Sequence, residues 1–222
     1  MNPIAVNVLM DPDAATIALA RALNDRLRSD FPQGFAFDDN HAPHVTLVQC
    51  FIDRDKLAEA AHAVSVALQA AGPVNWQSKA TGLYALSDGK LGLAGIVIQP
   101  TDDFRRVQLR VIEAISPFLT PEGTAAAFAP RLDGGEIGQA TVDYVMGFIA
   151  ASTGQNFNAH LTVGIGTNGF IDALKAEPFK SFPFQAVSLS LYQLGDYGVA
   201  QKKLHHLHDL SLIHISEPTR QP

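Results

Sequence analysis

Apolar residues follow two patterns along the chain, and the first pattern predicts strands. Short, nearly continuous apolar runs are bounded by Gly, Pro, Asn or Asp, which is typical of buried or half-buried strands. The runs that we interpret as strands are residues 4–10, 44–51, 74–87, 91–99, 158–166, 184–194 and 199–207. The third and fourth runs are separated by Asp88-Gly89, a strong signal for a hairpin turn.

The second pattern predicts helices between these runs. Here apolar residues recur every three or four positions and would form one buried face, as Phe104, Val107, Val111 and Ile115 do. The predicted helices are residues 13–29, 57–71, 101–118, 140–152 and 171–176.

Both patterns fail between residues 120 and 138. This stretch, which contains PEGTAAAFAPRLDGGEIG, is rich in small and turn-forming residues. We expect a flexible loop insertion or lid here, and not a linker between independent domains. The prediction is therefore one domain over residues 1–209, with lobes that share strands.

The elements on the two sides of this loop repeat in the same order. Each half has a helix, a strand that contains His-x-Thr, a second helix and a long hairpin, over residues 13–99 and 140–207. Helices mixed with hairpins are typical of α+β folds. We expect a bilobal α+β fold with a pseudo-two-fold duplication, in which two antiparallel sheets line a central cleft and the helices lie outside.

The last residues resemble a sequence that is not native. LSLIHISEPTR, at residues 210–220, is similar to the translated read-through of a transposase sequencing adapter. We expect residues 210–222 to be a non-native tail and the natural sequence to end near Asp209. The His-x-Ser match that begins at His214 is set aside for this reason.

Composition and charge limit the class of protein and of partner. Of the 222 residues 47% are hydrophobic, and no apolar run approaches the ~20 residues of a membrane helix. The start of the chain lacks the basic region of a secretory signal, and Cys50 has no partner for an internal disulfide. We therefore expect a cytoplasmic protein with no membrane partner, and we expect it to be a monomer. The net charge of −6 argues against broad binding of long nucleic acid but allows a small nucleotide or an RNA terminus.

The motif His-x-Thr occurs twice, as HVTL and as HLTV, each time inside an apolar run. Residues two apart in a strand point to the same face. His44 and Thr46 would therefore project together, as would His160 and Thr162, while their apolar neighbours face the core. If the halves pack about a pseudo-two-fold axis, the two pairs face each other across a cleft.

Two such pairs suit phosphodiester chemistry. One imidazole can take a proton from the attacking oxygen while the other gives a proton to the leaving oxygen, because imidazole titrates near neutral pH. Threonine hydroxyls can donate to the non-bridging oxygens of the phosphate. The candidate catalytic residues are thus His44 and His160, and the candidate phosphate-binding residues are Thr46 and Thr162. One motif alone would more often be a half-exposed strand histidine, and it is the pair at equivalent places that favours catalysis.

The sequence predicts neither a metal site nor a cofactor. It contains no HExxH, no ligand spacing of cysteines, no cluster of Asp and Glu, and no glycine-rich phosphate loop before a lysine. His41, three residues before His44, and the closing HHLH are interpreted as loop and edge-strand residues, not as metal ligands.

With HVTL, NAHLTVG and the closing hairpin LSLYQLGDYGVAQKKLHHL, the sequence resembles the 2H phosphoesterase superfamily, the two-histidine enzymes related to bacterial and archaeal 2′-5′ RNA ligases. In element order the resemblance extends from about Ile4 to Leu207. It implies two pseudo-symmetric lobes with the active site in the groove between them, and metal-independent hydrolysis or transfer at 2′,3′-cyclic phosphates or 2′-5′ phosphodiesters. The motif match implies that His44 and His160 are catalytic. The stretch between the motifs is wider than in compact members, which makes the substrate harder to infer than the chemistry.

Three further residues are candidate substrate contacts. Tyr192 and Tyr197 flank the turn of the last hairpin, where one of them could stack on a base, although such tyrosines more often pack a sheet. Arg131, in the 120–138 loop, is a cation that could clamp a phosphate.

The function predicted from these residues is a phosphoesterase that opens 2′,3′-cyclic phosphates of nucleotides or RNA ends. A 2′-5′ RNA ligase is an alternative that would differ only in the attacking group. A nucleotide- or RNA-binding module without turnover is another, since it would keep the same cleft. An α+β scaffold with coincidental histidines would have no cleft that contains both side chains.

Overall fold

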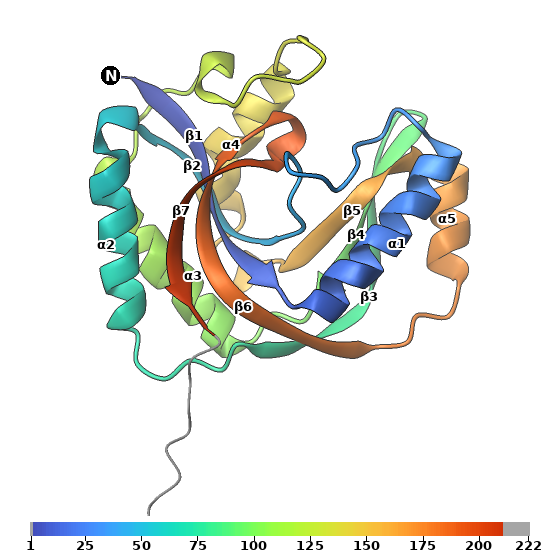
Figure 1. Cartoon of the computed structure of the whole chain (residues 1–222), viewed down its shortest axis with the longest axis horizontal. Helices are drawn as coiled ribbons and strands as arrows, with labels where there is room; N and C mark the ends of the chain where they lie inside the picture. Colours follow the sequence, from blue (N-terminus) through green and yellow to red (C-terminus); the bar gives the residue numbers. More distant parts are fainter. Residues whose placement is uncertain (1, 211–222) are drawn as a thin grey trace, which may run out of the picture.

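The computed structural model describes residues 2–210, and over this range every predicted strand and helix is present (Figure 1). The strands are β1 (Pro3–Pro12), β2 (Val45–Asp53), β3 (Gln77–Asp88), β4 (Leu91–Ile98), β5 (His160–Thr167), β6 (Phe182–Leu194) and β7 (Ala200–Asp209). The helices are α1 (Ala14–Asp30), α2 (Leu57–Gln69), α3 (Asp102–Ile115), α4 (Gln139–Ala151) and α5 (Asn168–Ala176). The predicted α+β class is confirmed.

A clear difference in bounds is at β3, which begins at Gln77 and not at residue 74. Gly72, after the end of α2, has a left-handed backbone with φ of 71°. The side chain of Asn75 then accepts a hydrogen bond from the N–H of Gln77 at 3.0 Å. The chain turns at both positions, and the strand that pairs with β6 begins at Gln77.

The predicted non-native tail is represented in the described residues by Leu210, whose N–H donates to the carbonyl of Val187. The rest of that tail, including the motif at His214, lies outside the described residues.

Within residues 2–210, seven strands form an antiparallel sheet whose order has pseudo-two-fold symmetry. The order is β2-β1-β6-β3-β4-β5, and β7 pairs with β6. Reversing this order exchanges β2 with β5, β1 with β4 and β6 with β3, so each end of the sheet carries one His-x-Thr motif. β6 pairs with β3 through its first residues and with β1 and β7 through its later ones. It curves from one lobe to the other, so the two lobes share it (Figure 1).

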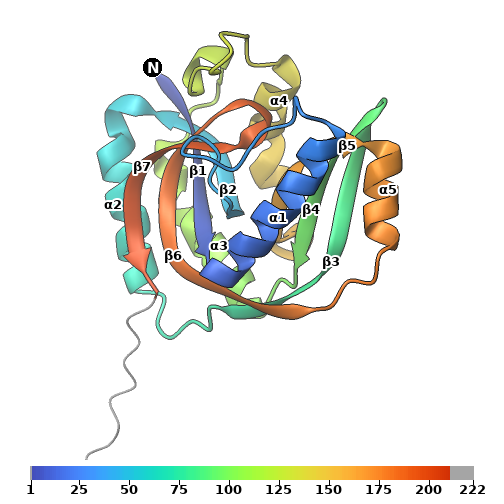
Figure 2. The ribbon, with the colours of Figure 1, turned by 45° about the vertical axis from the view of Figure 1, so that its right-hand side comes forward.

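The helices cover the sheet in a crossed arrangement. α1 precedes β2 in the chain but packs against β5, and α3 precedes β5 but packs against β2. α1 and α5 lie along the lobe of β3, β4 and β5, whereas α2, α3 and α4 lie along the other lobe (Figures 1 and 2). Within the part of the chain that the structure describes, none of the helices combines the length and apolar character that a membrane crossing requires.

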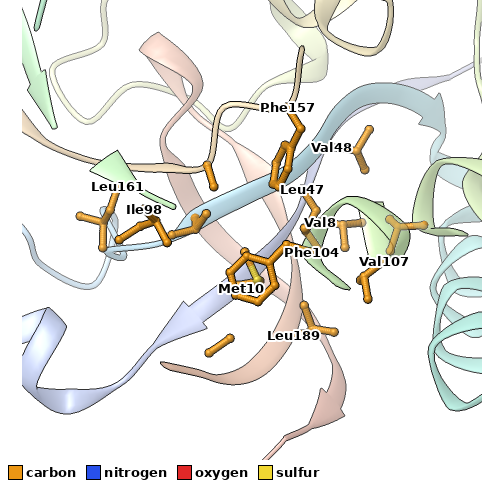
Figure 3. Close-up of a cluster of buried hydrophobic side chains, with 14 of the residues drawn as sticks. Val8, Met10, Leu47, Val48, Ile98, Phe104, Val107, Phe157, Leu161 and Leu189 are labelled. Carbon is orange, nitrogen blue, oxygen red and sulfur yellow. The ribbon is translucent and has the colours of Figure 1, made fainter. Parts of the chain in front are cut away.

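The apolar face predicted for α3 is buried in the main core. Figure 3 shows Val8 and Met10 of β1 beside Leu47 of β2 and Phe104 of α3. Phe104 is fully buried, and its ring lies edge-to-face with that of Phe184 at a centroid distance of 6.2 Å. Burial of each such side chain contributes about 1.5–3 kcal/mol, so this face anchors α3 on the sheet.

Both His-x-Thr strands contain a β-bulge at the residue after the threonine. The register skips Leu47 in β2 and Val163 in β5. A bulge adds one unpaired residue, so it reverses the face to which later side chains point. Gln49 and Ile165 therefore lie on the same side as the motifs, although simple alternation would turn them away.

Each bulge is bonded by a buried amide side chain from a helix of the other half. The Nδ2 of Asn24 in α1 donates to the carbonyl of Val163 at 2.8 Å. The Nε2 of Gln108 in α3 donates to the carbonyl of Leu47 at 3.0 Å. Both amides are almost completely buried, so they replace the ladder partners that the bulges remove.

The same amides hold the loops that lead into the two motifs. Asn24 donates to the carbonyl of Phe35 at 2.9 Å, before the first motif. Gln108 donates to the carbonyl of Ser152 at 2.7 Å and accepts from the N–H of Gly154 at 3.2 Å, before the second motif. One side chain thus connects each motif loop to the bulge of the opposite lobe.

These contacts identify α3 as the counterpart of α1, whereas the repeat expected from the sequence used α4. α4 and the loops on either side of it are additional to the repeat. They account for the long separation between the two motifs.

The 120–138 loop is tied to the sheet, which differs from the expectation of a flexible lid. The N–H of Ala129 donates to a carbonyl of β6 at 2.8 Å, and the side chain of Gln193 donates to the carbonyl of Ala127 at 3.0 Å. Phe128 is buried with its ring edge-to-face with Phe51, at a centroid distance of 5.6 Å. Ala127 and Phe128 of this loop therefore belong to a small core that they share with residues of the sheet and of α4.

Replacing Gln108 with leucine should lower the free energy of unfolding by about 2–4 kcal/mol. The carbonyls of Leu47 and Ser152 and the N–H of Gly154 would each lose a partner in the interior. Urea unfolding followed by circular dichroism measures the change. Gln69→Leu is the matched control, because Gln69 is exposed at the end of α2, and it should change the value by less than about 0.5 kcal/mol. Equal stability of the two variants would contradict the role given to Gln108.

Candidate active site

His44 and His160 are held in the same way by the residues that precede them. The Nδ1 of His44 lies 2.8 Å from the carbonyl oxygen of Ala42, and the Nδ1 of His160 lies 2.8 Å from the carbonyl oxygen of Asn158. A carbonyl oxygen only accepts, so each Nδ1 carries a proton and donates it. The Nε2 of each ring is therefore the atom that remains to exchange a proton.

Burial lowers the pKa of both imidazoles, because a charged ring is disfavoured away from water. The hydrogen bonds to Ala42 and Asn158 oppose this shift at the two rings. At His44 the charge of His160 lowers the pKa further, and Asp11 raises it. Both rings line the same cavity, so a positive charge on one disfavours a positive charge on the other.

Each threonine hydroxyl has a partner on a neighbouring strand. The Nδ2 of Asn7 in β1 lies 3.1 Å from the Oγ1 of Thr46 and donates to it. The hydroxyl of Tyr84 in β3 lies 2.9 Å from the Oγ1 of Thr162. These bonds orient both threonines, and a hydroxyl can make more than one hydrogen bond. Both Oγ1 atoms can therefore still bond a ligand in the cleft.

Tyr84 reaches Thr162 by lying across β4. Tyr84 pairs with Gly95 in β4, and Gly95 pairs with Thr162 in β5. A Cβ atom on Gly95 would lie 2.0 Å from Cε1 of Tyr84, so glycine is needed for the ring to pass. The ring also lies edge-on to that of His160, at a centroid distance of 4.7 Å. Burial raises the pKa of the Tyr84 hydroxyl well above its usual range, so this group stays protonated.

All four motif side chains line one cavity of about 300 Å³. The cavity is therefore the cleft that the sequence predicts between the two motifs. Its other walls are mostly apolar and aromatic, and they are formed by Phe35, Phe37, His41, Ala42, Gln49, Tyr84, Leu86, Leu93, Ala140, Thr141, Tyr144, Tyr197, Gly198 and Val199. Neither Lys nor Arg occurs among these lining residues of the described chain, so histidines are the groups that can carry positive charge here.

Tyr197 lines this cavity, but Tyr192 does not. Tyr192 is buried in a small cluster with Leu9 and Ala200. The Nζ of Lys203 lies 5.9 Å from the centroid of its ring, and burial raises the pKa of its hydroxyl to about 12. Tyr192 thus packs the sheet, the more common of its two expected roles.

Arg131 lies outside the cavity and is ion-paired with Asp133 and Asp196. These pairs raise the pKa of the guanidinium, and Arg131 lowers the pKa of Asp133. Asp196 also accepts a hydrogen bond from the hydroxyl of Thr141 in α4 at 3.0 Å. The side chain expected to clamp phosphate instead ties the 120–138 loop to the turn between β6 and β7.

His41 also lines the cavity, as a wall residue. Its ring stacks on that of Phe35 at a centroid distance of 5.3 Å, and its Nδ1 lies 3.4 Å from a carboxylate oxygen of Asp38. Among residues 2–210, no three His, Cys, Asp or Glu side chains gather where they could hold one metal ion.

Several residues in or beside the cavity were not predicted from the sequence. Asn7 and Gln49 are polar residues inside apolar strands and are fully or almost fully buried. That pattern is a readable signal, because a buried polar side chain usually has a specific partner. Tyr84 and Tyr144 had no comparable signal, since tyrosine is common on half-buried strands and helices.

Comparison with known families and structures places the chain among known proteins. A family model described as the 2′-5′ RNA ligase superfamily matches residues 11–197. No curated protein matches the chain in sequence.

Among solved structures, E. coli LigT complexed with 3′-AMP is similar at 12% identity, over 92% of this chain and 96% of that chain, with a TM-score of 0.45. Kluyveromyces marxianus Usb1 is similar at 10% identity, over 91% of this chain and 95% of that chain, with a TM-score of 0.42. The same Usb1 with uridine monophosphate is similar at 11% identity, over 91% and 95% of the two chains, with a TM-score of 0.39.

The family match spans most of the chain and includes both His-x-Thr motifs. The protein therefore belongs to the 2′-5′ RNA ligase superfamily of 2H phosphoesterases.

Proposed function

We propose that this protein opens 2′,3′-cyclic phosphates on nucleotides or RNA ends by proton transfer through two histidines. The observation that supports this most strongly is that the two imidazoles have the same hydrogen bond and the same tautomer in one cavity. His44 and His160 line one cavity, and each donates its Nδ1 proton to a backbone carbonyl two residues earlier. In each ring Nε2 is therefore the atom that can exchange a proton with a ligand in the cavity.

In the proposed reaction, the neutral imidazole removes a proton from water as the water oxygen attacks phosphorus. The bond from phosphorus to one ribose oxygen breaks, and the protonated imidazole gives that oxygen a proton. The products are a phosphomonoester and a free ribose hydroxyl. The base ends the cycle protonated and the acid ends it neutral, so exchange with solvent restores the starting state.

The hydroxyls of Thr46 and Thr162 would donate to the non-bridging oxygens, where charge changes in the transition state. Because the described lining contains neither Lys nor Arg, the protonated histidine would supply the positive charge opposite the phosphate. A cyclic phosphodiester carries a single negative charge, which one imidazolium can balance.

A 2′-5′ RNA ligase is the second candidate, and the description of the matched family favours it. A ribose hydroxyl would then take the place of water as the attacking group, and the same two histidines would transfer the protons. Incubation with two RNA ends distinguishes the candidates, because a ligase lengthens the RNA whereas a phosphodiesterase only opens the ring.

Replacing either His44 or His160 with alanine should lower kcat on adenosine 2′,3′-cyclic phosphate by about 10²- to 10⁴-fold. Each substitution removes one partner of the proton-transfer pair. The assay is chromatographic detection of adenosine monophosphate. His62→Ala is the matched control, because His62 is exposed on α2, and it should retain full activity. Unchanged turnover in either cavity variant would contradict the assignment.

The pH profile of kcat/KM should be bell-shaped, with its maximum below about pH 6.5. The rate rises as the base loses its proton and falls as the acid loses its own, and burial lowers the pKa of both imidazoles. The measurement covers about pH 4 to about pH 9. The folded fraction is checked at each pH, because buried neutral histidines make the fold less stable as the pH falls. A falling limb centred above about pH 7 would disagree with the lowered pKa values.

Tyr84→Phe should lower kcat by about five- to tenfold, because Thr162 would lose the hydroxyl that orients it. A double-mutant cycle separates this effect from general damage. Tyr84→Phe and Thr162→Val should be strongly non-additive, since both remove the same hydrogen bond. Tyr84→Phe and Thr46→Val, in opposite lobes, should be additive. Additive effects in both pairs would show that the bond to Thr162 has no role in turnover.

A further inference from the structure

A second cavity of about 210 Å³ lies directly beside the one that contains the motifs. The two cavities share four lining residues, Phe35, His41, Tyr197 and Val199. Phe35 and His41 come from the loop before β2, and the other two come from the turn between β6 and β7. The two cavities are therefore neighbours, and these two segments form the wall that they have in common.

Tyr197 stands at this boundary on a fixed backbone. Its φ is 56° and its ψ is 18°, a left-handed conformation that is uncommon for a residue with a side chain. The carboxylate of Asp196 holds it, because Oδ1 accepts from the N–H of Tyr197 and from the hydroxyl of Thr141, both at 3.0 Å. Arg131 binds the other oxygen of Asp196. The Tyr197 side chain is nevertheless exposed, so the turn presents an aromatic ring that packs little of the core.

The opposite side of the boundary is aromatic as well. Phe35 and His41 stack with an interplanar angle of 4°. The carbonyl of Phe35 is held by the buried side chain of Asn24 at 2.9 Å. The wall between the cavities therefore carries an exposed tyrosine and a stacked aromatic pair, and flat rings on fixed backbone are suitable partners for nucleobases.

The charges of the second cavity favour a neutral occupant. Arg131 is the cation among its lining residues in the described chain, and it is already paired with Asp133 and Asp196. One positive and two negative groups leave no unpaired cation for a phosphate inside this cavity, so it suits a nucleoside whose linking phosphate stays at the boundary between the two cavities. The amide of Gln33 and the apolar side chains of Leu132 and Ile165 complete walls that suit a base or a ribose.

We propose that the second cavity binds the nucleoside next to the reacting nucleotide, so that the preferred substrate is an RNA end of at least two nucleotides. This proposal rests on the proposed function, because it places the cyclic phosphate at His44 and His160. The terminal nucleotide occupies the first cavity, and the ring of Tyr197 lies between the two nucleosides.

The test compares adenosine 2′,3′-cyclic phosphate with the dinucleotide adenylyl-(3′-5′)-adenosine 2′,3′-cyclic phosphate. The kcat/KM should be about tenfold higher for the dinucleotide, the typical effect of one additional stacked base. Leu132→Asp adds a carboxylate to the second cavity and should bring the ratio of the two kcat/KM values close to one. Leu109→Asp is the matched control, because Leu109 is an exposed leucine on α3, and it should leave the ratio unchanged.

A ratio near one in the unmodified protein would overturn the proposal while leaving the proposed function intact, as would a ratio that Leu132→Asp does not change. If neither substrate is turned over, the proposed function fails, and calorimetric binding of the two ring-opened products tests the second cavity separately. About tenfold tighter binding of the dinucleotide product supports the cavity, and equal binding overturns it.

Discussion

The hydrogen bonds from Asn24 and Gln108 to the two bulges are the contacts on which the rest of the site depends. Each His-x-Thr strand interrupts its ladder one residue after the threonine, and a buried amide from the other half bonds the carbonyl at the interruption. The same amide holds the loop before the other motif. Because each amide connects both halves, the position of one motif cannot change without affecting the other. The crossed packing of α1 and α3 is the consequence at the level of the fold.

The pseudo-two-fold symmetry of the sheet is broken inside the cavity. Thr46 is oriented by an amide, whereas Thr162 is oriented by a phenol that passes over a glycine. After the bulges, Gln49 lines the first cavity, whereas its counterpart Ile165 lines the second. α4 and the 120–138 loop have no counterpart in the other half. A symmetric pair of proton-transfer groups therefore lies in an asymmetric surrounding, as a substrate with two different ends requires.

Periodicity predicted nearly all of the fold, because helices and strands here have clear apolar faces. The two motifs could likewise be placed on one cavity from sequence, since both lie in apolar strands of similar surroundings. The bulges could not, because a one-residue insertion in a ladder leaves the apolar pattern intact and Leu47 resembles any core residue. The contact of Tyr84 with Thr162 depends on the absence of a side chain at Gly95, and it joins three strands whose pairing the sequence pattern does not reveal. The ion pair of Arg131 with Asp196 could not be predicted either, because the two residues are distant in sequence.

The central claim is that two histidines open a cyclic phosphate without a metal ion. The most direct test is incubation of the protein with adenosine 2′,3′-cyclic phosphate in excess EDTA, beside the double variant His44→Ala/His160→Ala. The account predicts adenosine monophosphate from the unmodified protein alone, and the isomer formed identifies the ribose oxygen that leaves. Product from the double variant, or a reaction that EDTA abolishes, would contradict it.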